Sequence, residues 1–340
     1  MGDNEDGPAL TERVELHGCS CKVGQGELDD ILTDAGLVAD QPELLFGVGE
    51  DAAARQLRDD LALVQTVDFF TPIVDDPYDF GRVAACNAAS DAFASGAVDD
   101  VSCLVVMALP RDLTDVAVDV LAGIVDALET MDGAVAGGHT TLNPWPIAGG
   151  AVTATAHPDD LLTTRAAAPG DRLYLTKPLG TQPAMGALRV KDGEFAATVR
   201  ETAPRPVEAI AEDALAWMTT PNRTAAVAAR EYASAATDVT GFGLAGQSSV
   251  LAENAGVGVA LTHLPVIDGT PALSSLFGYG LASGESAETS GGLLLSVPSD
   301  HETDLQNALA DAGVFHRNVG RVTDGTGVTL DDPTREEIRR

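Results

Sequence analysis

A polar break near the middle of the sequence constrains the fold more than any other feature, because it divides the chain into two halves. Residues 157–171 are rich in polar residues and contain Pro158, Pro169 and Gly170, a composition typical of connections between domains. The chain has 340 residues, more than one ordinary hydrophobic core spans. The boundaries we expect are 1–24 for a flexible, glycine-containing segment, 25–157 for a first domain and 158–340 for a second.

Both halves mix strand and helix patterns. The β-branched run at residues 61–70 predicts a strand, and residues 78–95 predict a helix that Gly96 ends. Residues 113–131 carry apolar side chains at helical spacing, which predicts a long amphipathic helix. Two α+β domains follow from this mixture. The other strands we expect are 44–48, 101–109, 134–136, 147–155, 173–175, 257–261 and 292–297, and the other helices are 27–35, 207–218, 224–233, 243–254 and 302–312.

The chain carries a formal net charge of −32, with acidic residues spread along its length. Nucleic acids and anionic membranes repel such a polyanion, so neither is an expected partner. We interpret the composition as adaptation to high salt, which screens the self-repulsion. No apolar run reaches the roughly 18 residues of a membrane span, and the acidic N-terminus is neither a signal nor a transit peptide, which predicts a cytoplasmic protein. An anionic substrate would need a divalent cation or a locally positive loop.

Two cysteines and a lysine share one short segment, Cys19-Ser20-Cys21-Lys22, which glycines flank. We expect an exposed loop in which the ammonium of Lys22 favours the reactive thiolate and can also pair with phosphate. The segment could instead be an ordinary surface loop. A metal site formed by His17, Cys19 and Cys21 is a third interpretation, although this spacing is tighter than that of usual zinc ligands. The two remaining cysteines, Cys86 and Cys103, lie in apolar runs and are expected to pack in the core.

Four aspartates stand among small and apolar residues rather than in acidic runs. Asp51 follows a Gly-Val-Gly-Glu turn, Asp68 lies near the end of a predicted strand, and Asp238 is part of a Thr-Asp-Val-Thr-Gly segment. Asp91 lies four residues after Asn87, so both share one helix face. Carboxylates at such positions are suitable ligands for Mg²⁺, which protein carboxylates and phosphate oxygens commonly hold together.

Glycine-rich turns suggest anion binding, but two common nucleotide motifs are ruled out. The turn at residues 137–140 could form a nest of backbone N–H groups, and the turn at 289–292 is either similar or a plain tight turn. The chain contains no P-loop sequence. Residues 47–52 match a dinucleotide-binding pattern, but the eight residues before the next strand are too few for a crossover helix. A β-hairpin fits this region better.

Taken together, these segments resemble one family, the selenophosphate synthetases (selenide, water dikinases). Residues 18–22 are similar to that family's Gly-Cys-Gly-Cys-Lys segment, and residues 66–82 match its Asp-Phe-Phe signature almost residue for residue. The likeness runs from about residue 17 to 330. Further matching segments, several shared with the wider aminoimidazole ribonucleotide synthetase superfamily, are 87–96, 137–139, 175–180, 237–243 and 289–292.

The resemblance implies a two-domain aminoimidazole ribonucleotide synthetase-like fold, with the N-terminal sheets paired across a homodimer and a C-terminal α/β sandwich. It implies synthesis of selenophosphate from ATP, selenide and water, with release of AMP and phosphate, in a first domain that binds ATP and Mg²⁺. The implied residues are Cys19 and Lys22 for catalysis, Asp51, Asp91 and Asp238 for Mg²⁺, and Lys22, Val48, Gly49, Glu50, Asp68, Asp91, Gly138, His139 and Thr140 for the nucleotide.

The sequence departs from the family pattern at several places. Residues 286–288 are Ser-Ala-Glu where the family has Asp-Pro-Gln, Gln247 replaces a histidine, and residues 140–142 are Thr-Thr-Leu where a Ser-Ile-Asp type of run is usual. A Gly-Gly-Thr stretch expected between residues 264 and 290 is missing. These departures leave two alternatives open: an ATP-dependent relative that acts on another nucleophile, and a non-catalytic ATP-binding relative.

Overall fold

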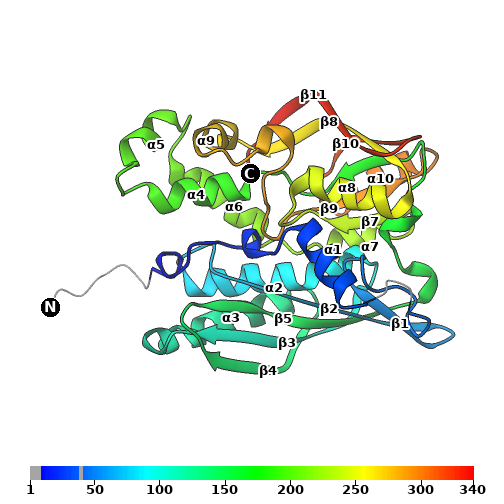
Figure 1. Cartoon of the computed structure of the whole chain (residues 1–340), viewed down its shortest axis with the longest axis horizontal. Coiled ribbons are helices and arrows are strands. Elements are labelled where there is room, and N and C mark those ends of the chain that lie inside the picture. Colours follow the sequence, from blue (N-terminus) through cyan, green and yellow to red (C-terminus); the bar gives the residue numbers. More distant parts are fainter. Residues whose placement is uncertain (1–8, 38–40) are drawn as a thin grey trace.

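The chain folds into two α+β domains that pack on each other, as the sequence predicted (Figure 1). The structure is a computed structural model that describes residues 9–37 and 41–340; residues 1–8 of the predicted N-terminal segment lie outside the described residues. The first domain contains α1 (Gln25–Asp34), β1 (Ala53–Arg58), β2 (Leu61–Phe70), α2 (Pro77–Ala94), β3 (Asp99–Leu109), α3 (Ala117–Glu129), β4 (Ala134–Leu142) and β5 (Ile147–Ala156).

The five strands of the first domain form one sheet in the order β1-β2-β5-β3-β4. Strands β1 and β2 pair antiparallel as a hairpin, which confirms the prediction that no crossover helix follows the glycine turn. Strands β3 and β4 pair in parallel, and α3 connects them. Two predicted elements are wrong. Residues 44–48 form only an isolated bridge at Phe46, and the helix expected from residue 113 begins instead as a 3-10 turn, Arg111–Val116, before α3.

Helix α2 is the central element of the molecule and lies between the first sheet and the second domain (Figure 1). The side chain of Asp76 accepts a hydrogen bond from the Asp79 backbone N–H, and Pro77 occupies the first turn, which together start the helix. Gly96 follows the last turn with a φ of +82°, a conformation that glycine adopts without strain. The helix packs closely on α3 at Gly81, where an added Cβ would lie 2.0 Å from the Val120 carbonyl oxygen.

The second domain is built on a six-stranded mixed sheet in the order β11-β8-β10-β6-β9-β7. Several of its elements were not expected from the sequence: α4, α5, α9, β7, β10 and β11. Its elements are β6 (Arg172–Leu175), α4 (Thr181–Val190), α5 (Ala196–Thr202), α6 (Val207–Met218), α7 (Arg223–Ala229), β7 (Ala235–Asp238), α8 (Gly243–Ala255), β8 (Gly258–Ile267), α9 (Thr270–Phe277), β9 (Leu293–Val297), α10 (Glu302–Asp311), β10 (Arg317–Thr323) and β11 (Gly327–Ile338).

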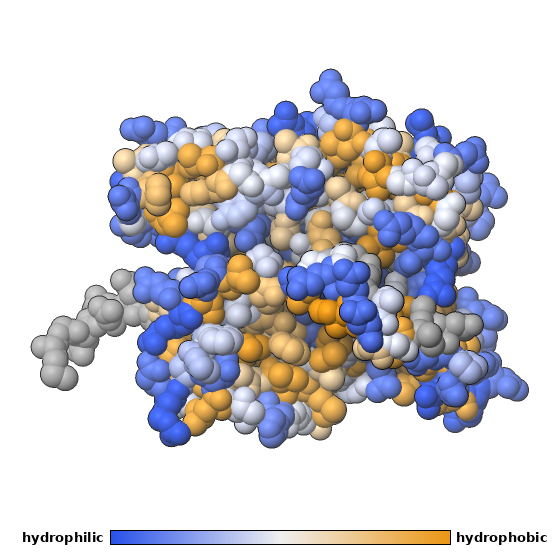
Figure 2. All heavy atoms as spheres, viewed as in Figure 1, coloured by the Kyte–Doolittle hydropathy of each residue, from blue (hydrophilic) through white to orange (hydrophobic). Residues whose placement is uncertain are grey.

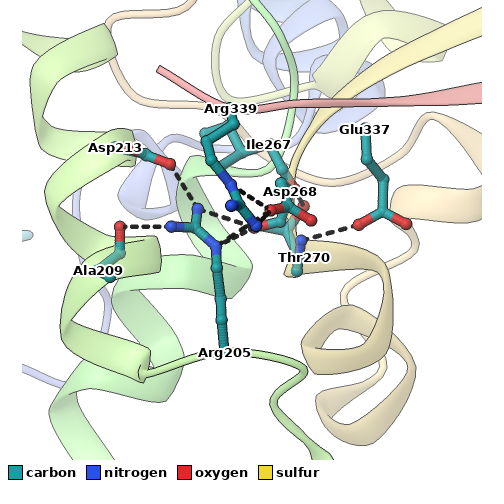
Figure 3. A network of polar contacts seen from close by, with 9 residues as sticks. Arg205, Ala209, Asp213, Ile267, Asp268, Thr270, Glu337 and Arg339 are labelled. Carbon is teal, nitrogen blue, oxygen red and sulfur yellow. Dashed lines mark hydrogen bonds and ion pairs between the residues drawn. The ribbon is translucent and has the colours of Figure 1, made fainter.

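A polar network joins the last strand to the helices of this domain (Figure 3). Arg205 donates to the carbonyl oxygens of Ala209 and Asp268 and pairs with Asp213 on α6. Arg339, which follows β11, pairs with the Asp268 carboxylate. The network therefore ties α6 to the β8–α9 turn and to the end of β11. Among the described residues, no helix has the length and apolar character needed to cross a bilayer.

Candidate metal and phosphate site between the domains

Three carboxylates from three different elements meet where the two domains face each other. Asp51 lies in the turn before β1, Asp91 on α2 and Asp238 at the end of β7. Each offers an oxygen, and these oxygens all lie within 4.8 Å of one another. The structure therefore brings together the three aspartates that the sequence analysis grouped as implied magnesium ligands.

Hydroxyl and amide groups orient this cluster of Asp51, Asp91 and Asp238. Thr66 Oγ1 donates to Asp91 Oδ2 at 2.7 Å, and Thr237 Oγ1 donates to Asp51 Oδ1 at 2.9 Å. Gln247 on α8 is buried and donates to both Thr237 Oγ1 and the Asp238 carbonyl oxygen, each at 2.9 Å. The sequence identified Gln247 only as a departure from the family pattern, whereas its position shows that it supports two of the three carboxylate-bearing segments.

The electrostatics of the cluster favour a cation. Burial raises the pKa of all three carboxyl groups, and the mutual repulsion of their charges raises the pKa values of Asp51 and Asp91 further. Asp238 is 2% exposed, and its Oδ2 has no hydrogen-bond partner among the described residues. Buried acceptors of this kind are costly when left unpaired. An all-oxygen set of converging carboxylates fits a hard divalent cation such as Mg²⁺.

A hydrogen-bonded chain connects Cys19 to Lys22 beside this cluster. Cys19 Sγ donates to Asn87 Oδ1 at 3.3 Å, and Asn87 Nδ2 donates to Asp68 Oδ2 at 2.7 Å. Lys22 Nζ pairs with the same Asp68 oxygen at 2.8 Å, and the Lys22 side chain is 32% exposed. The four residues come from the N-terminal segment, β2 and α2. These hydrogen bonds therefore also hold the N-terminal segment against the first domain.

The expected exposed thiolate is wrong for this structure. Cys19 is 1% exposed, because Gly18 bridges to Thr71 and the Cys19 backbone N–H donates to Thr289 Oγ1 in the second domain. Burial raises the pKa of the Cys19 thiol, and the opposing effect of Lys22 is smaller. Burial disfavours the charge of Lys22, but the negative groups around it, Asp68 among them, raise its pKa. In this arrangement Cys19 is a neutral thiol and Lys22 an ammonium.

A cavity of about 510 Å³ opens onto Lys22 and the three carboxylates. Its lining combines Lys22 and the carboxylate cluster with several apolar side chains, and α1 and α8 both contribute to it. A ligand with an anionic part and a weakly polar part fits this lining. The apolar lining residues are Leu28, Leu32, Leu37, Val48, Phe242 and Val250.

The remaining residues implied for the nucleotide fall in two places. Val48, Gly49 and Glu50 line the cavity. The Glu50 carboxylate, however, accepts hydrogen bonds from Thr164 and pairs with Arg165 at 3.0 Å, so it already joins the two domains. The segment 138–140 lies on β4, at the opposite edge of the sheet from β1, and its three residues Gly138, His139 and Thr140 are exposed and do not line this cavity.

The turn at residues 289–292 closes the site from the second domain. Besides the Thr289 contact with Cys19, the Ser290 backbone N–H donates to Asn87 Oδ1 at 2.8 Å. Ser290 has a φ of +51°, and an added Cβ on Gly291 would lie 1.9 Å from the Val239 carbonyl oxygen. This strained and closely packed turn therefore positions Cys19 and Asn87. The role of this turn depends on contacts with residues far away in the sequence, so the sequence alone did not establish it.

Glu288 anchors this turn to α4. Its carboxylate accepts hydrogen bonds from the backbone N–H groups of Gly180 and Thr181 and from Thr181 Oγ1, at 2.5 to 2.8 Å. The residue is 1% exposed. It is one of the positions at which the sequence departs from the family pattern, and a carboxylate at the N-terminus of a helix is favourable. Burial nevertheless raises the pKa of Glu288 to about 7, against the hydrogen bonds that lower it.

This raised pKa predicts a specific pH dependence of stability. A carboxyl group that holds its proton more tightly in the folded state loses stability as the pH rises from its ordinary value of 4.5 to about 7. We expect a loss of about 3 kcal/mol over that interval, because each pH unit within it changes the free energy of unfolding by about 1.36 kcal/mol. Glu288→Gln should remove this loss, so the difference in unfolding free energy between wild type and variant should change with pH. Parallel curves from pH 4.5 to 8 would contradict the assignment.

The chain matches two consecutive family models. Residues 49–156 match "AIR synthase related protein, N-terminal domain", and residues 168–333 match "AIR synthase related protein, C-terminal domain". It is 41% identical to the selenide, water dikinase of Methanococcus maripaludis over 325 residues, which cover 93% of this chain and 96% of the relative. It is also 41% identical to that of Methanocaldococcus jannaschii, over 92% of each chain.

Solved structures with low identity share the fold. The tt0281 protein from Thermus thermophilus aligns with a TM-score of 0.69 at 22% identity, covering 91% of this chain and 97% of that one. The structure described as AaThiL complexed with AMPPCP and TMP aligns with a TM-score of 0.68 at 18% identity, covering 93% and 94%. At these identities the likeness concerns the architecture alone.

Proposed function

This chain belongs to the selenide, water dikinase family of AIR synthase related proteins, and from that membership we propose how its interdomain cavity carries out the synthesis of selenophosphate. The reaction consumes ATP, selenide and water and yields selenophosphate, AMP and phosphate. The observation that supports the assignment most strongly is the position of Lys22 and three converging carboxylates in one cavity, directly beside the Cys19–Asn87–Asp68 chain.

Asp51, Asp91 and Asp238 would hold Mg²⁺. Bound there, Mg²⁺ would offset the three negative charges and neutralise phosphate oxygens of ATP. The carboxylates remain near their present positions through Thr66, Thr237 and Gln247, so little rearrangement is needed on binding. A protein with a net charge of −32 requires such a neutralising site to hold a triphosphate.

Lys22 and Cys19 would act at the phosphate end of the cavity. Lys22 pairs with Asp68 in this structure. Rotation of the Lys22 side chain toward the cavity would let its ammonium pair with a phosphate group instead. The Cys19 thiol donates a hydrogen bond to Asn87 Oδ1, and this bond keeps the sulfur oriented. Because the segment that carries both residues packs against the second domain, it keeps Cys19 away from solvent.

The base of ATP would occupy the apolar part of the cavity. Val48 and Gly49 provide backbone and small side-chain surface there, and Leu28, Leu32 and Phe242 provide a covering wall. Asp68 would contribute through Lys22 rather than by direct contact with an anion, because two negative groups repel each other. Glu50 would act indirectly, by holding the cavity wall against Thr164 and Arg165.

The outer face of the first sheet supports a homodimer. Val67 on β2 and Leu104 on β3 both lie opposite Ala151 of β5, so they share one face, and Leu104 is 52% exposed. Figure 2 shows hydrophobic surface over the strands of this domain. Such a patch on an otherwise acidic surface is typical of an interface. A second copy packed there would also explain how Gly138, His139 and Thr140 reach a nucleotide, since these residues do not line the cavity of their own chain.

Leu104→Glu is therefore expected to convert a dimer into monomers of 34.9 kDa. The substitution places a charge in the middle of the apolar face, where burial would be costly. Light scattering coupled to size-exclusion chromatography at high salt would measure the mass. Val118→Glu is the matched control, because Val118 is exposed on α3, away from this face. A monomeric wild type, or equal masses for wild type and the Leu104 variant, would contradict the dimer.

An anaerobic turnover assay tests the function itself. Protein, Mg-ATP and selenide would be incubated in high salt, which suits the acidic composition, and AMP and phosphorus-31 signals would be followed. We expect AMP together with a signal from phosphorus bonded to selenium, and no such signal without selenide. Production of ADP with another acceptor would indicate a different phosphotransferase of the same superfamily, and nucleotide binding without turnover would indicate a non-catalytic relative.

A further inference from the structure

A second cavity lies in the second domain, between α6, α7 and α10, on the far side of the 289–292 turn from Cys19. Its volume is about 530 Å³. None of its lining residues in the described part of the chain is Asp or Glu, although the sequence has 52 acidic and only 20 basic residues. Two of the basic side chains, Lys177 and Arg340, line it. A lining without acidic side chains and with two cationic ones points to an anionic ligand in a protein this acidic.

Lys177 forms the inner end of this cavity. It is 3% exposed, and its Nζ donates to the Ser290 carbonyl oxygen at 2.7 Å. This is one hydrogen bond of the three that an ammonium can donate. Burial lowers the pKa of Lys177 to about 8, partly offset by the neighbouring Cys86 and Asp238. An anion in the cavity would stabilise the charged form of Lys177 and use its remaining donors.

Trp217 and Arg340 also line this cavity. The indole N–H of Trp217 on α6 is buried without a hydrogen-bond partner among the described residues. The guanidinium of Arg340 lies 4.6 Å from the centre of the Trp217 ring and donates to Thr220 Oγ1. Asn222 lines the cavity and donates to the Gly291 carbonyl oxygen, so Lys177 and Asn222 both hold the turn that contacts Cys19.

We propose that this cavity binds a phosphate-bearing anion through Lys177 and Arg340. A phosphate group offers several strong acceptors and up to two negative charges, which match one ammonium and one guanidinium. The volume also admits a larger molecule that carries such a group. Two sources share this chemistry, orthophosphate and AMP, and naming them as the sources rests on the proposed function, which releases both. An anion bound in this cavity would affect the backbone of residues 290–291, which lies behind Cys19.

Fluorescence of Trp217 tests this proposal without any need for turnover. The chain has two tryptophans, so a Trp145→Phe background leaves Trp217 as the single reporter. Titration with inorganic phosphate at constant ionic strength should give a saturable change in emission. Adding Thr224→Glu should weaken the apparent affinity at least tenfold, because Thr224 is exposed on α7 and lines the cavity, where a carboxylate repels the anion. Thr224→Gln, the neutral control, should stay within about twofold.

A titration with AMP distinguishes between the two sources of the phosphate group, orthophosphate and AMP. If AMP titrates at least tenfold more tightly than phosphate in the same background, the site takes the nucleotide; equal affinities assign it to the phosphate group alone. Lys177→Met provides a second variant and should abolish the response to both. The proposal is overturned if Trp217 emission shows no saturable change, or if the Glu and Gln variants at position 224 titrate alike. Because the readout is binding, its failure would leave the turnover assay of the proposed function unaffected.

Discussion

Cys19→Ser is expected to lower selenide-dependent AMP release by roughly a thousandfold or more, the range seen when a reacting group is removed. The substitution is nearly isosteric, and a serine hydroxyl can donate to Asn87 Oδ1 as the thiol does. The Cys19 backbone contact with Thr289 is also retained. If Cys19 served only to pack the segment, the variant would keep its activity. A large loss therefore identifies the chemistry of sulfur rather than its shape as the requirement.

The measurement is a comparison of turnover with binding of a non-hydrolysable ATP analogue, which should stay within about twofold of wild type. Cys21→Ser is the matched control, since Cys21 is the neighbouring, partly buried thiol and the hydrogen bond to Asn87 comes from Cys19. We expect it to have a milder effect. Equal activity of Cys19→Ser and wild type would remove Cys19 from the mechanism.

Asp238→Asn should change stability and activity in opposite directions. Without metal, three buried carboxyl groups repel one another, and their raised pKa values mean that the folded state holds protons more tightly than the unfolded chain. Stability of the metal-free protein must then fall as the pH rises above the ordinary carboxyl value of 3.8. Removing one charge should stabilise the protein in EDTA at pH 7 by roughly 1 kcal/mol or more.

The same variant should lose about a hundredfold or more in activity at fixed Mg²⁺, since even groups that only orient a metal ligand cost 10- to 100-fold when removed. Thermal unfolding in EDTA and in Mg²⁺ would measure the first effect, and turnover against Mg²⁺ concentration the second. Asp115→Asn, an exposed substitution beside α3, controls for loss of surface charge. A variant that is less stable in EDTA than wild type, or that still responds to Mg²⁺ like wild type, would contradict the metal site.

Local patterns predicted the elements whose stability is local. The strand at residues 61–70 and the helix near 78–95 occur almost as expected, because alternation, an Asp-Pro start and a Gly stop all act within a few residues. Residues 44–48 have the same apolar character but form only one bridge, since no strand within 9–37 or 41–340 pairs with them beyond Phe46. Strands β10 and β11 are polar and were missed because they become strands only through pairing with distant partners: β10 pairs with β6 and β8, and β11 pairs with β8.

The candidate site was predictable in part of its residues but not in its geometry. The setting identified Asp51, Asp68, Asp91 and Asp238 as a group, the family resemblance implied three of them as Mg²⁺ ligands, and the structure places the oxygens of those three together. The burial of Cys19 depends on Thr289, 270 residues away, and no local signal carries that contact. Gln247 acts through Thr237 on the opposite domain's Asp51, so its contribution is visible only once the two domains are assembled.

The most direct test is a crystal structure of the protein with a non-hydrolysable ATP analogue and Mn²⁺, whose anomalous scattering locates the ion independently of the protein atoms. We predict anomalous peaks in contact with the carboxylates of Asp51, Asp91 and Asp238 and with phosphate oxygens, and Lys22 turned from Asp68 toward the same phosphates. Peaks elsewhere, or a triphosphate bound away from these three side chains, would contradict the account.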